Sequence, residues 1–458
     1  MNWNNNIILM TDSYKISHWN LYPENTTQVY SYFESRVGSK FPSTLFFGLQ
    51  YFLKNYLEGQ VVTQEKIDEA EEIFNLHFRQ KIFNRNGWEY ILNKHNGYLP
   101  VKIKAIPEGM IVPESNVLMT VENTDPNCYW ITNYLETLLV QIWYSCTVAT
   151  QSKVMKNLIS SYLEDTGDIN LLPFKMNDFG YRGTSSPEQA GLGGAAHLVN
   201  FQGTDTLAGV LLARKFYNAK MPGFSIPATE HSTITSWGKE HEIDAMRNML
   251  EKYPNGLIAC VSDSFDIFNA CKNYWGTELK EKVLARDGTL VVRPDSGDPP
   301  VIVLQVLNIL GERFGFSINE KGYKVLNPKV RVIQGDGIDF KMLDKILLTM
   351  KENQWSIDNI AFGSGGGLLQ KDINRDTQRF AFKCSSVFVN GEERDVYKQP
   401  ITGSDKASKR GKLKLIWNNN QFKTVNVNDS GEDLMKTVFE NGKITKEYSF
   451  DEIRRKSS

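Results

Sequence analysis

Residues 257–298 decide the fold class: LIACVSDSFDIFNACKNYWGTELKEKVLARDGTLVVRPDSGD. Two short apolar runs in this stretch, LIACVS (257–262) and TLVVR (289–293), are rich in branched residues and predict buried strands. Residues 265–284 between them have the spacing of an amphipathic helix. A strand, a helix and a second strand in this order predict one βα unit of a parallel sheet.

The same alternation of short apolar runs and longer helical stretches continues from about residue 170 to residue 365. It predicts five further strands, which are LPFKM (172–176), HLVNF (197–201), FSIP (224–227), VRVIQ (330–334) and NIAFG (359–363). Seven strands joined by helices within roughly 200 residues favour a barrel. We therefore predict an α/β protein built on an irregular βα barrel of about seven strands.

Both ends of the chain have a different pattern. Segments that alternate polar and apolar residues occur near the N-terminus, as in QVYSYF (28–33), and again near the C-terminus, as in LKLIW (413–417). This alternation is typical of strands with one solvated face. We expect residues 1–165 and 379–458 to form one mixed α+β domain from both chain ends, and residues 166–378 to form the barrel.

The composition excludes several classes of protein. With 41% hydrophobic and 23% charged residues among 458, the chain is globular and is neither disordered nor membrane-spanning. Lys and Arg number 52 against 53 Asp and Glu, so no net charge favours a nucleic acid or a membrane as partner. Five widely spaced cysteines and no export signal indicate a cytoplasmic protein without disulfides.

Polar and glycine-rich turns follow the predicted strands. In a βα barrel these turns open at one face, where barrel enzymes build their active sites. Each turn alone is ordinary, because Asp, Ser and Gly are common in turns and helix caps. Seven of them at one rim favour a site; they are 178–182, 203–205, 230–231, 262–264, 293–296, 335–337 and 363–367.

Several of these turns suit an anionic ligand. The run GSGGG (363–367) lacks the GK[ST] ending of a P-loop, but its backbone N–H groups are free to hold a phosphate. The guanidinium group of Arg293 is suited to bidentate binding of a phosphate, and the Asp295 carboxylate could accept hydrogen bonds from sugar hydroxyls. The two side chains could also simply neutralise each other. The run GLGGAA (191–196) follows no strand, so we interpret its small residues as helix packing.

Two further features have an ordinary and a functional interpretation. The six histidines form no zinc motif, and His231 is notable only because it follows a predicted strand at the rim. Cations in the C-terminal tail form either a solvated face or a phosphate contact; they are Lys398, Lys406, Lys409, Arg410, Lys412 and Lys414. With Phe179 as a flat apolar face, the rim suits a phosphorylated sugar that carries an aromatic ring.

Nine segments, in order along the chain, resemble the nicotinamide phosphoribosyltransferase family. They are TDSYKISHWNLYP, VYSYFESR, NDFGYRGTSS, GTDT, PATEHSTITSWG, VSDSFDI, VRPDSGDP, IQGDGI and AFGSGGGLLQK. The resemblance implies the type II phosphoribosyltransferase fold. It also implies synthesis of nicotinamide mononucleotide and pyrophosphate from nicotinamide and phosphoribosyl pyrophosphate, on a homodimer with sites at the subunit interface.

The resemblance also implies roles for residues at the base. Phe179 would stack on one face of the nicotinamide ring, and Tyr14 of the partner chain on the other. Asp205 would accept a hydrogen bond from the carboxamide, which a nicotinate carboxylate could not make without like-charge repulsion. Arg182 would assist at the base.

Further implied roles concern the phosphates and the ribose. Arg293 would contact the diphosphate, and Asp295 and Asp336 would hold ribose hydroxyls beside Gly335. The 5′-phosphate would bind Ser364, Gly365 and Gly366, with Arg36, Arg375 and Lys383 supplied by the other subunit.

The implied chemistry uses two additional components. Mg²⁺ would stabilise the departing pyrophosphate, although the sequence does not indicate which residues hold it. ATP would be an optional co-substrate that phosphorylates His231, with Glu230 and Asp263 orienting the imidazole. Two other functions remain open: a nicotinate phosphoribosyltransferase, and a non-catalytic binding module on the same fold.

Overall fold

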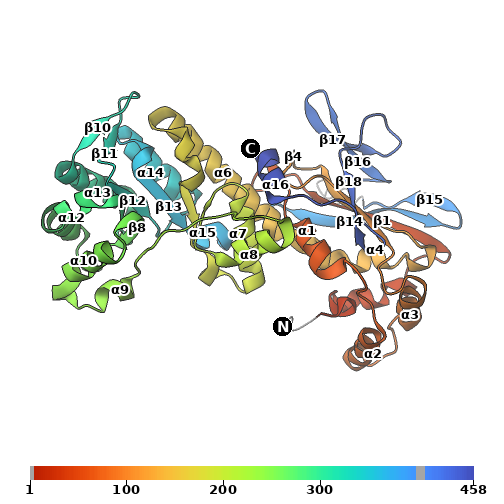
Figure 1. Ribbon diagram of the computed structural model, residues 1–458. Coiled ribbons are helices and arrows are strands. Elements are labelled where there is room, and N and C mark those ends of the chain that lie inside the picture. The colour runs from red at the N-terminus through yellow and green to blue at the C-terminus, as the bar shows by residue number, and fades with distance from the viewer. Residues whose placement is uncertain (1–4, 399–407) are drawn as a thin grey trace. The chain divides into compact units, whose positions relative to one another are not determined.

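The computed structural model describes residues 5–398 and 408–458, and Lys406 of the tail cations lies outside them. The chain folds into two compact units. We call Gln151–Arg214 with Lys220–Lys371 the barrel unit, and Met1–Thr150, Lys215–Ala219 and Asp372–Ser458 the sheet unit. The units divide at residues 150 and 371, whereas the sequence suggested boundaries near 165 and 378; the first division falls within the long helix α6 (Figure 1).

The barrel unit is built on a parallel sheet with the strand order β7-β6-β13-β12-β9-β8. The later residues of β8 and β9, and most of β12 and β13, are buried and rich in branched side chains, as expected for a sheet covered on both faces. The strands are β6 (Met176–Asp178), β7 (Gly203–Thr204), β8 (Asn255–Val261), β9 (Asp287–Arg293), β12 (Val330–Gln334) and β13 (Ile360–Ser364).

Residues 224–229 join the two edges of this sheet. On one side, Thr204 N–H donates to the Phe224 carbonyl at 2.9 Å. On the other, Thr229 N–H donates to the Ala259 carbonyl at 3.0 Å, and Ala259 N–H donates to Pro227 at 2.9 Å. The predicted strand FSIP is therefore only a bridging segment, but it completes an irregular ring of seven elements, and the predicted α/β barrel class is confirmed.

The predicted strand HLVNF (197–201) is wrong. Residues up to Leu198 belong to α7 (Pro187–Leu198), which the Ser186 side chain caps. The small residues of α7 pack as interpreted, because a Cβ on Gly209 would lie 2.6 Å from the Gly194 backbone of α7. This close approach of two helices explains the run GLGGAA without a dinucleotide site.

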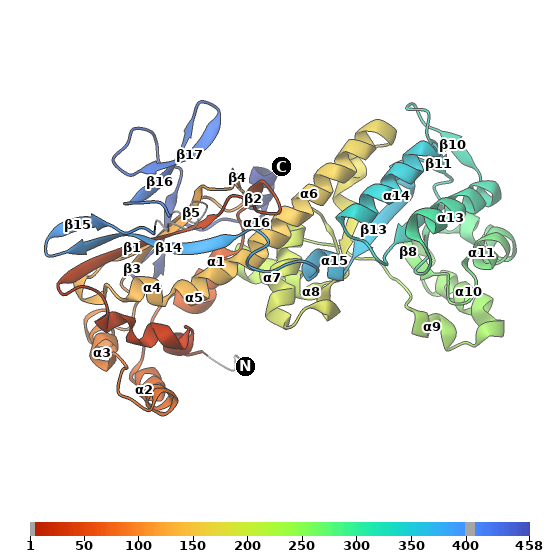
Figure 2. The ribbon, with the colours of Figure 1, turned by 180° about the vertical axis from the view of Figure 1, so that it is seen from behind.

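Helices connect the barrel strands, and Figure 2 shows α13 and α14 side by side along the sheet. The helices are α6 (Trp143–Thr166), α7, α8 (Leu207–Tyr217), α9 (His231–Thr235), α10 (Glu242–Lys252), α11 (Ile267–Asn269), α12 (Lys280–Ala285), α13 (Pro299–Phe314), α14 (Phe340–Glu352) and α15 (Gly366–Leu369). The short hairpin of β10 (Phe316–Ile318) and β11 (Lys324–Leu326) follows α13. Inside the ring, Ala259, Val291 and Ile333 form an apolar cluster against which Phe179 packs.

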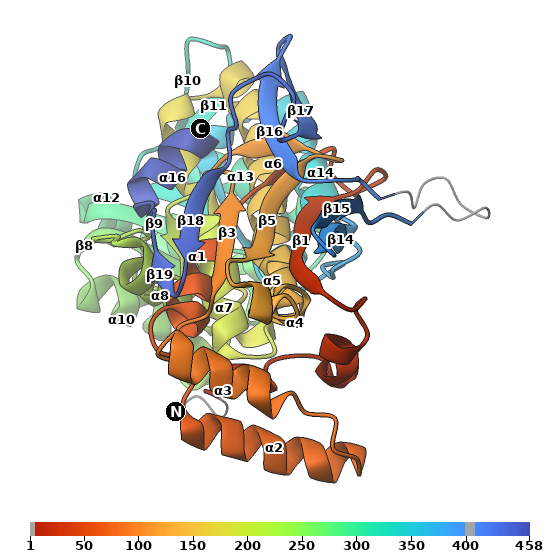
Figure 3. The ribbon, with the colours of Figure 1, turned by 90° about the vertical axis from the view of Figure 1, so that its right-hand side faces the viewer.

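The sheet unit contains a seven-stranded sheet to which both chain ends contribute, as the fold class predicted. Figure 3 shows its strands side by side, in the order β15-β14-β1-β5-β3-β18-β19. They are β1 (Thr26–Ser35), β3 (Val101–Ala105), β5 (Val117–Asn123), β14 (Phe380–Val389), β15 (Glu392–Asp395), β18 (Lys436–Glu440) and β19 (Lys443–Ile444). All of its pairings are antiparallel.

Helices and two small sheets complete this unit. Its helices are α1 (Leu49–Phe52), α2 (Gln64–Phe78), α3 (Arg85–Lys94), α4 (Ile131–Tyr134), α5 (Glu136–Leu139) and α16 (Phe450–Ser457). Its small sheets pair β2 (Ser43–Leu45) with β4 (Ile111–Pro113), and β16 (Leu413–Asn418) with β17 (Gln421–Asn426).

Glu108 lies in the loop between β3 and β4 and is buried, with its carboxylate at the N-terminal end of α1. Its carboxylate accepts the backbone N–H groups of Gly48 and Gln50 at 2.9 and 2.7 Å. Burial nevertheless raises the pKa of Glu108 to about 7, because an ionised carboxylate is poorly solvated there.

No helix in the described part of the chain combines the length and the apolar character that crossing a membrane requires.

Candidate active site

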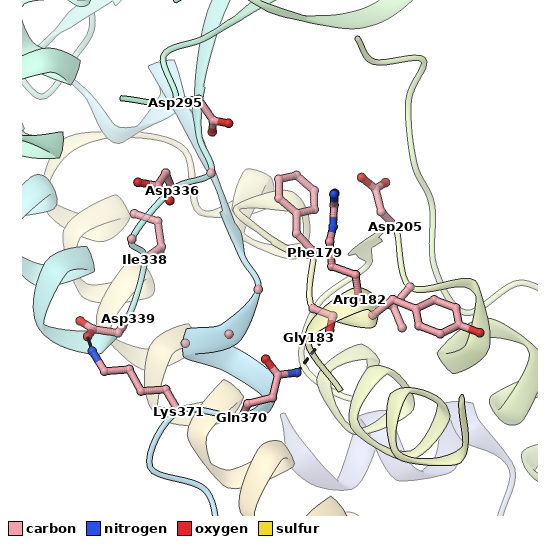
Figure 4. A pocket seen from close by; sticks show the side chains of 18 of the residues that line it. Phe179, Arg182, Gly183, Asp205, Asp295, Asp336, Ile338, Asp339, Gln370 and Lys371 are labelled. Carbon is pink, nitrogen blue, oxygen red and sulfur yellow. Dashed lines mark hydrogen bonds and ion pairs between the residues drawn. The ribbon is translucent and has the colours of Figure 1, made fainter. Parts of the chain in front are cut away.

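A cavity of about 750 Å³ opens at the carboxyl ends of the barrel strands. Parallel sheets place their ligand sites at this edge. Figure 4 shows Phe179, Arg182 and Asp205 on one side of the cavity, and Asp295, Asp336, Asp339 and Lys371 on the other. The lining includes eleven residues that the sequence singled out, namely Phe179, Arg182, Asp205, His231, Arg293, Asp295, Gly335, Asp336, Gly365, Gly366 and Gly367.

The Phe179 ring lies against two glycines. A Cβ on Gly363 would lie 2.0 Å from the ring, and one on Gly335 would lie 3.3 Å from it. The backbone holds the ring in place, since Phe179 N–H donates to the Ser364 carbonyl at 3.0 Å. A side chain at residue 363 would displace the ring, whereas a Cβ at residue 335 would require only a small shift.

Arg293 and Asp295 form a bidentate ion pair. Arg293 Nε and Nη2 donate to the two carboxylate oxygens of Asp295 at 3.0 and 2.8 Å. The pair neutralises itself, as the ordinary interpretation of this turn allows, yet both side chains line the cavity. The Arg293 guanidinium also lies 5.6 Å from the centre of the Phe179 ring, so a cation and an apolar face are adjacent.

Asp205 presents an exposed carboxylate beside Phe179. Its position follows from the strand before it, because Asp205 N–H donates to the Asp178 carbonyl at 2.9 Å. The hydroxyl of Ser225 donates to its side chain. Arg182, in the turn after β6, lines the same side of the cavity.

His231 is the first residue of α9 and is half-exposed. Its Nε2 lies 3.2 Å from Oδ1 of Asp263, whose side chain is only 3% exposed. Glu230 makes different contacts: its carboxylate accepts the Ser232 hydroxyl, and its N–H donates to Thr233 Oγ1 at 3.3 Å. Of the two acids expected to orient the imidazole, Asp263 contacts the ring and Glu230 caps the helix.

The glycine turn after β13 lines the cavity next to the Phe179 backbone, since a Cβ on Gly365 would lie 3.2 Å from the Phe179 carbonyl oxygen. Gly365, Gly366 and Gly367 line it, whereas Ser364 is buried and its hydroxyl donates to the Ile338 carbonyl at 2.7 Å. Ser364 therefore directs its side chain away from the position where a phosphate was expected.

Sequence reasoning missed several cavity residues, among them Thr206, Asp339, Gln370 and Lys371. Lys371 donates to Asp339 at 2.7 Å, within reach of the glycine turn. Burial alone would raise the pKa of Asp339, but the hydrogen bonds from Lys371 and Met342 N–H keep it below its usual value. The sequence did offer a signal for Gln370 and Lys371, because both lie at the end of the glycine-rich segment AFGSGGGLLQK.

The four residues assigned to the partner subunit lie together in the sheet unit. Tyr14, Arg36, Arg375 and Lys383 all line a second cavity of about 710 Å³ there. Burial, and then the neighbouring charges of Arg36 and Arg375, lower the pKa of Lys383. The lining also holds three acids, Asp12, Glu136 and Asp376, so cations are only slightly in excess; Arg and Lys side chains that turn toward the cavity would suit an anion.

The tail cations that the structure describes have contacts within the sheet unit. Lys409 bonds to Glu34, and Lys412 donates to Gln28 Oε1 at 2.7 Å. Lys414 donates to the carbonyls of Asp429 and Gly431. These contacts give the cations a role within the sheet unit, and Lys414 is buried and so is not part of a solvated face.

The cavity residues can be tested against Mg²⁺. Asp336 offers carboxylate oxygens, which are the ligands that Mg²⁺ takes, usually with substrate phosphates completing its shell; both oxygens of Asp295 accept from Arg293 and become available only when that ion pair opens. The donor set therefore fits the ion. Among the described residues, three side chains of types that bind metals lie close together in the sheet unit: His95, Asp125 and Cys128. His95 Nε2 and Asp125 already bond to each other at 2.9 Å.

Residues 174–443 match the model of the nicotinate phosphoribosyltransferase (NAPRTase) family, and the chain belongs to that family. Residues 6–103 match the N-terminal domain of nicotinamide phosphoribosyltransferase. The chain is 48% identical over 466 residues to nicotinamide phosphoribosyltransferase of Xanthomonas campestris pv. campestris (strain 8004), covering 99% of this chain and 98% of that protein. It is 33% identical to nicotinamide phosphoribosyltransferase of Acinetobacter baylyi (strain ATCC 33305 / BD413 / ADP1), with 97% and 95% covered.

Solved structures agree on the fold. The crystal structure of nicotinate-nucleotide pyrophosphorylase from Pyrococcus furiosus matches with a TM-score of 0.64 at 17% identity, covering 100% of this chain and 96% of that chain. Human nicotinic acid phosphoribosyltransferase matches with a TM-score of 0.59 at 15% identity, covering 98% and 93%. At these identities the likeness concerns the fold alone.

Proposed function

We infer that this chain transfers the phosphoribosyl group of phosphoribosyl pyrophosphate to nicotinamide, giving nicotinamide mononucleotide and pyrophosphate. The relatives that it resembles over its whole length carry this activity in their names. The observation that carries the choice of base is the exposed Asp205 carboxylate beside the Phe179 ring. Such a carboxylate accepts from a carboxamide and repels the carboxylate of nicotinate.

The reaction builds positive charge on ribose C1 and negative charge on the leaving pyrophosphate. Arg293 would stabilise the departing anion once substrate competes with Asp295 for its guanidinium. Mg²⁺, when bound, would neutralise the diphosphate. Asp295 and Asp336 would accept ribose hydroxyls, and the backbone N–H groups of the 365–367 turn would hold the 5′-phosphate.

ATP would act through His231. The contact with Asp263 leaves the other ring nitrogen, Nδ1, as the candidate phosphoryl acceptor, and a carboxylate partner stabilises the charged imidazolium. We therefore assign His231 an auxiliary role that favours product formation, separate from transfer of the ribose. Phosphohistidine formed from labelled ATP by the wild type and absent in His231→Ala would support this role; label retained by the variant would contradict it.

The active enzyme would be a cytoplasmic homodimer. All five cysteines are unpaired, in keeping with a reducing compartment. The sheet-unit cavity with Tyr14, Arg36, Arg375 and Lys383 would complete the barrel cavity of the partner subunit, placing cations at the 5′-phosphate and a second ring at the base. Nucleic acids and membranes are not partners in this account.

Subunit complementation tests the shared site. Asp205→Ala and Lys383→Ala should each be inactive alone, but their co-purified heterodimer should regain about half of the wild-type activity, because one of its two sites is intact. A heterodimer of Asp205→Ala with Arg182→Ala is the matched control, since both changes affect barrel units and leave no intact site. An Asp205→Ala and Lys383→Ala heterodimer as inactive as this control would refute site sharing.

A further inference from the structure

Asp178 is a fully buried acid at the end of β6, directly below the cavity. Its Oδ1 accepts the Gly180 backbone N–H at 2.7 Å. Its Oδ2 is also buried and has no hydrogen bond of ordinary geometry to any residue that the structure describes. A buried carboxyl group with one oxygen that lacks a well-formed hydrogen bond is costly, so its presence here calls for a reason.

The backbone of Asp178 connects the three turns that form the base end of the cavity. β6 lies between β7 and β13, with Asp178 paired to Thr204 on one side and to Ser364 on the other. The Asp178 carbonyl accepts the N–H of Asp205, and the next residue, Phe179, donates to Ser364. The position of Asp178 therefore determines the positions of both Phe179 and Asp205.

The side chain of Asp178 also determines the turn that follows. The hydrogen bond to Gly180 fixes the backbone immediately after Phe179, and this turn continues to Arg182. No larger residue fits at position 180, because a Cβ there would lie 2.6 Å from Leu369 and 3.1 Å from Asp178 Oδ1. A hydrogen-bond acceptor at residue 178 thus fixes the positions of the Phe179 ring and of Arg182.

The unsatisfied oxygen lies in a narrow space with the Thr206 side chain. Thr206 Oγ1 is likewise buried without a hydrogen bond of ordinary geometry, and Thr206 lines the cavity. A Cβ on Gly194 would lie 3.3 Å from Asp178 Oδ2 and 3.0 Å from Thr206 Cγ2, so α7 closes this space from behind.

The charge of Asp178 acts in the same direction as that of Asp205. Burial raises the pKa of Asp178 to about 6, the N–H of Gly180 and the nearby Thr206 hydroxyl oppose that rise, and the like charge of Asp205 adds to it. At pH 8 Asp178 is therefore ionised. The like charges of Asp178 and Asp205 interact, and we expect both to oppose a negative substituent on the pyridine ring.

We propose that Asp178 is a specificity-determining positioning residue, which anchors the Phe179–Gly180 turn and adds a second negative charge behind Asp205 so that the site rejects a base carrying a carboxylate. The inference rests on the proposed function, because it assumes that Asp205 faces the base. A charge held in a water-excluded wall acts strongly on a like charge nearby, and about a tenfold effect on nicotinate binding is expected from it.

Steady-state kinetics at pH 8 with saturating phosphoribosyl pyrophosphate test this proposal. Asp178→Asn keeps an acceptor for Gly180 but removes the charge, so the preference for nicotinamide over nicotinate should fall about tenfold, through a lower KM for nicotinate. The kcat with nicotinamide should stay within about threefold of wild type. Asp178→Ala also removes the acceptor and should lower kcat/KM for nicotinamide itself.

Glu108→Gln is the matched control, because it changes another buried acid to its amide in the sheet unit. It should leave the preference between the two bases unchanged. If Asp178→Asn does not fold, as judged by its melting temperature, Asp178→Ser provides a smaller neutral replacement for which the same loss of preference is expected.

An unchanged preference in the folded neutral variant would overturn the role of Asp178, as would a loss of kcat for both bases without a change in their ratio. Wild-type protein that forms no nicotinamide mononucleotide would overturn the proposed function and this inference with it. The two failures are thus distinguished by the wild-type reaction.

Discussion

A methyl group at residue 363 would occupy space that the Phe179 ring now fills. In Gly363→Ala the new Cβ would lie 2.0 Å from Cε2 and 2.2 Å from Cδ2 of that ring, whereas ordinary contacts begin at 3.4 Å. The ring must therefore move by at least 1.4 Å, the difference between 3.4 and 2.0 Å. Residue 363 lies in β13 and has no positive φ, so the backbone can accept alanine. The Phe179 ring is therefore the group that must move.

The expected cost follows from this displacement. A misplacement of about 1 Å in a binding group costs on the order of 100-fold in activity, which corresponds to about 2.7 kcal/mol of transition-state stabilisation. We therefore expect kcat/KM for nicotinamide to fall on the order of 100-fold in Gly363→Ala. The assay is initial-rate formation of the mononucleotide over a range of nicotinamide concentrations, with melting temperatures to confirm folding.

A double-mutant cycle with Phe179→Ala isolates the ring. When the ring is absent, the methyl group has nothing to displace, so Gly363→Ala should cost less than about threefold in that background. Equal losses in both backgrounds would refute the reasoning, because the methyl group would then act through the backbone or through another residue.

Three further predictions follow from other parts of the protein. Asp205→Asn should weaken nicotinamide use by roughly tenfold or more, since a charge-assisted hydrogen bond is lost, and should relax rejection of nicotinate; unchanged selectivity in a competition assay would remove Asp205 from this role. His231→Ala should abolish stimulation by ATP and leave basal transfer, and persistence of the ATP effect would contradict the assignment. Because the folded-state pKa of Glu108 is raised from 4.5 to about 7, the native state holds a proton that the unfolded chain loses between these values. The free energy of unfolding should therefore fall by about 3 kcal/mol as pH rises through this window, and urea titrations of Glu108→Gln should lack that slope; an identical slope would be the contrary result.

The barrel could be predicted wherever local pattern and long-range pairing agree. LIACVS and TLVVR are buried parallel strands because their branched residues suit a sheet covered on both faces. HLVNF has the same apolar character, but His197 lies at the end of α7, where it bonds to Ser152 and stacks on Phe201. An apolar run of five residues cannot distinguish these outcomes, since both a buried helix end and a strand satisfy it.

The site was predictable where turn chemistry follows a strand, as for Asp205 and Asp336. Two kinds of information were missing from the pattern. Asp178 looks like an ordinary strand-end residue, and only the coordinates show that one of its carboxylate oxygens is enclosed beside the Thr206 hydroxyl, with no hydrogen bond of ordinary geometry to any described residue. The side chain of Ser364 is directed to the Ile338 carbonyl and away from the cavity, which spacing along the chain does not reveal.

The most direct test of the account is a single reaction that contains the protein, phosphoribosyl pyrophosphate, Mg²⁺ and equal concentrations of nicotinamide and nicotinate, with the products separated by chromatography. The account predicts nicotinamide mononucleotide in large excess. Predominance of nicotinate mononucleotide would contradict the role of the Asp205 carboxylate in base selection. Absence of both products would contradict the enzymatic function itself and favour a binding module on the same fold.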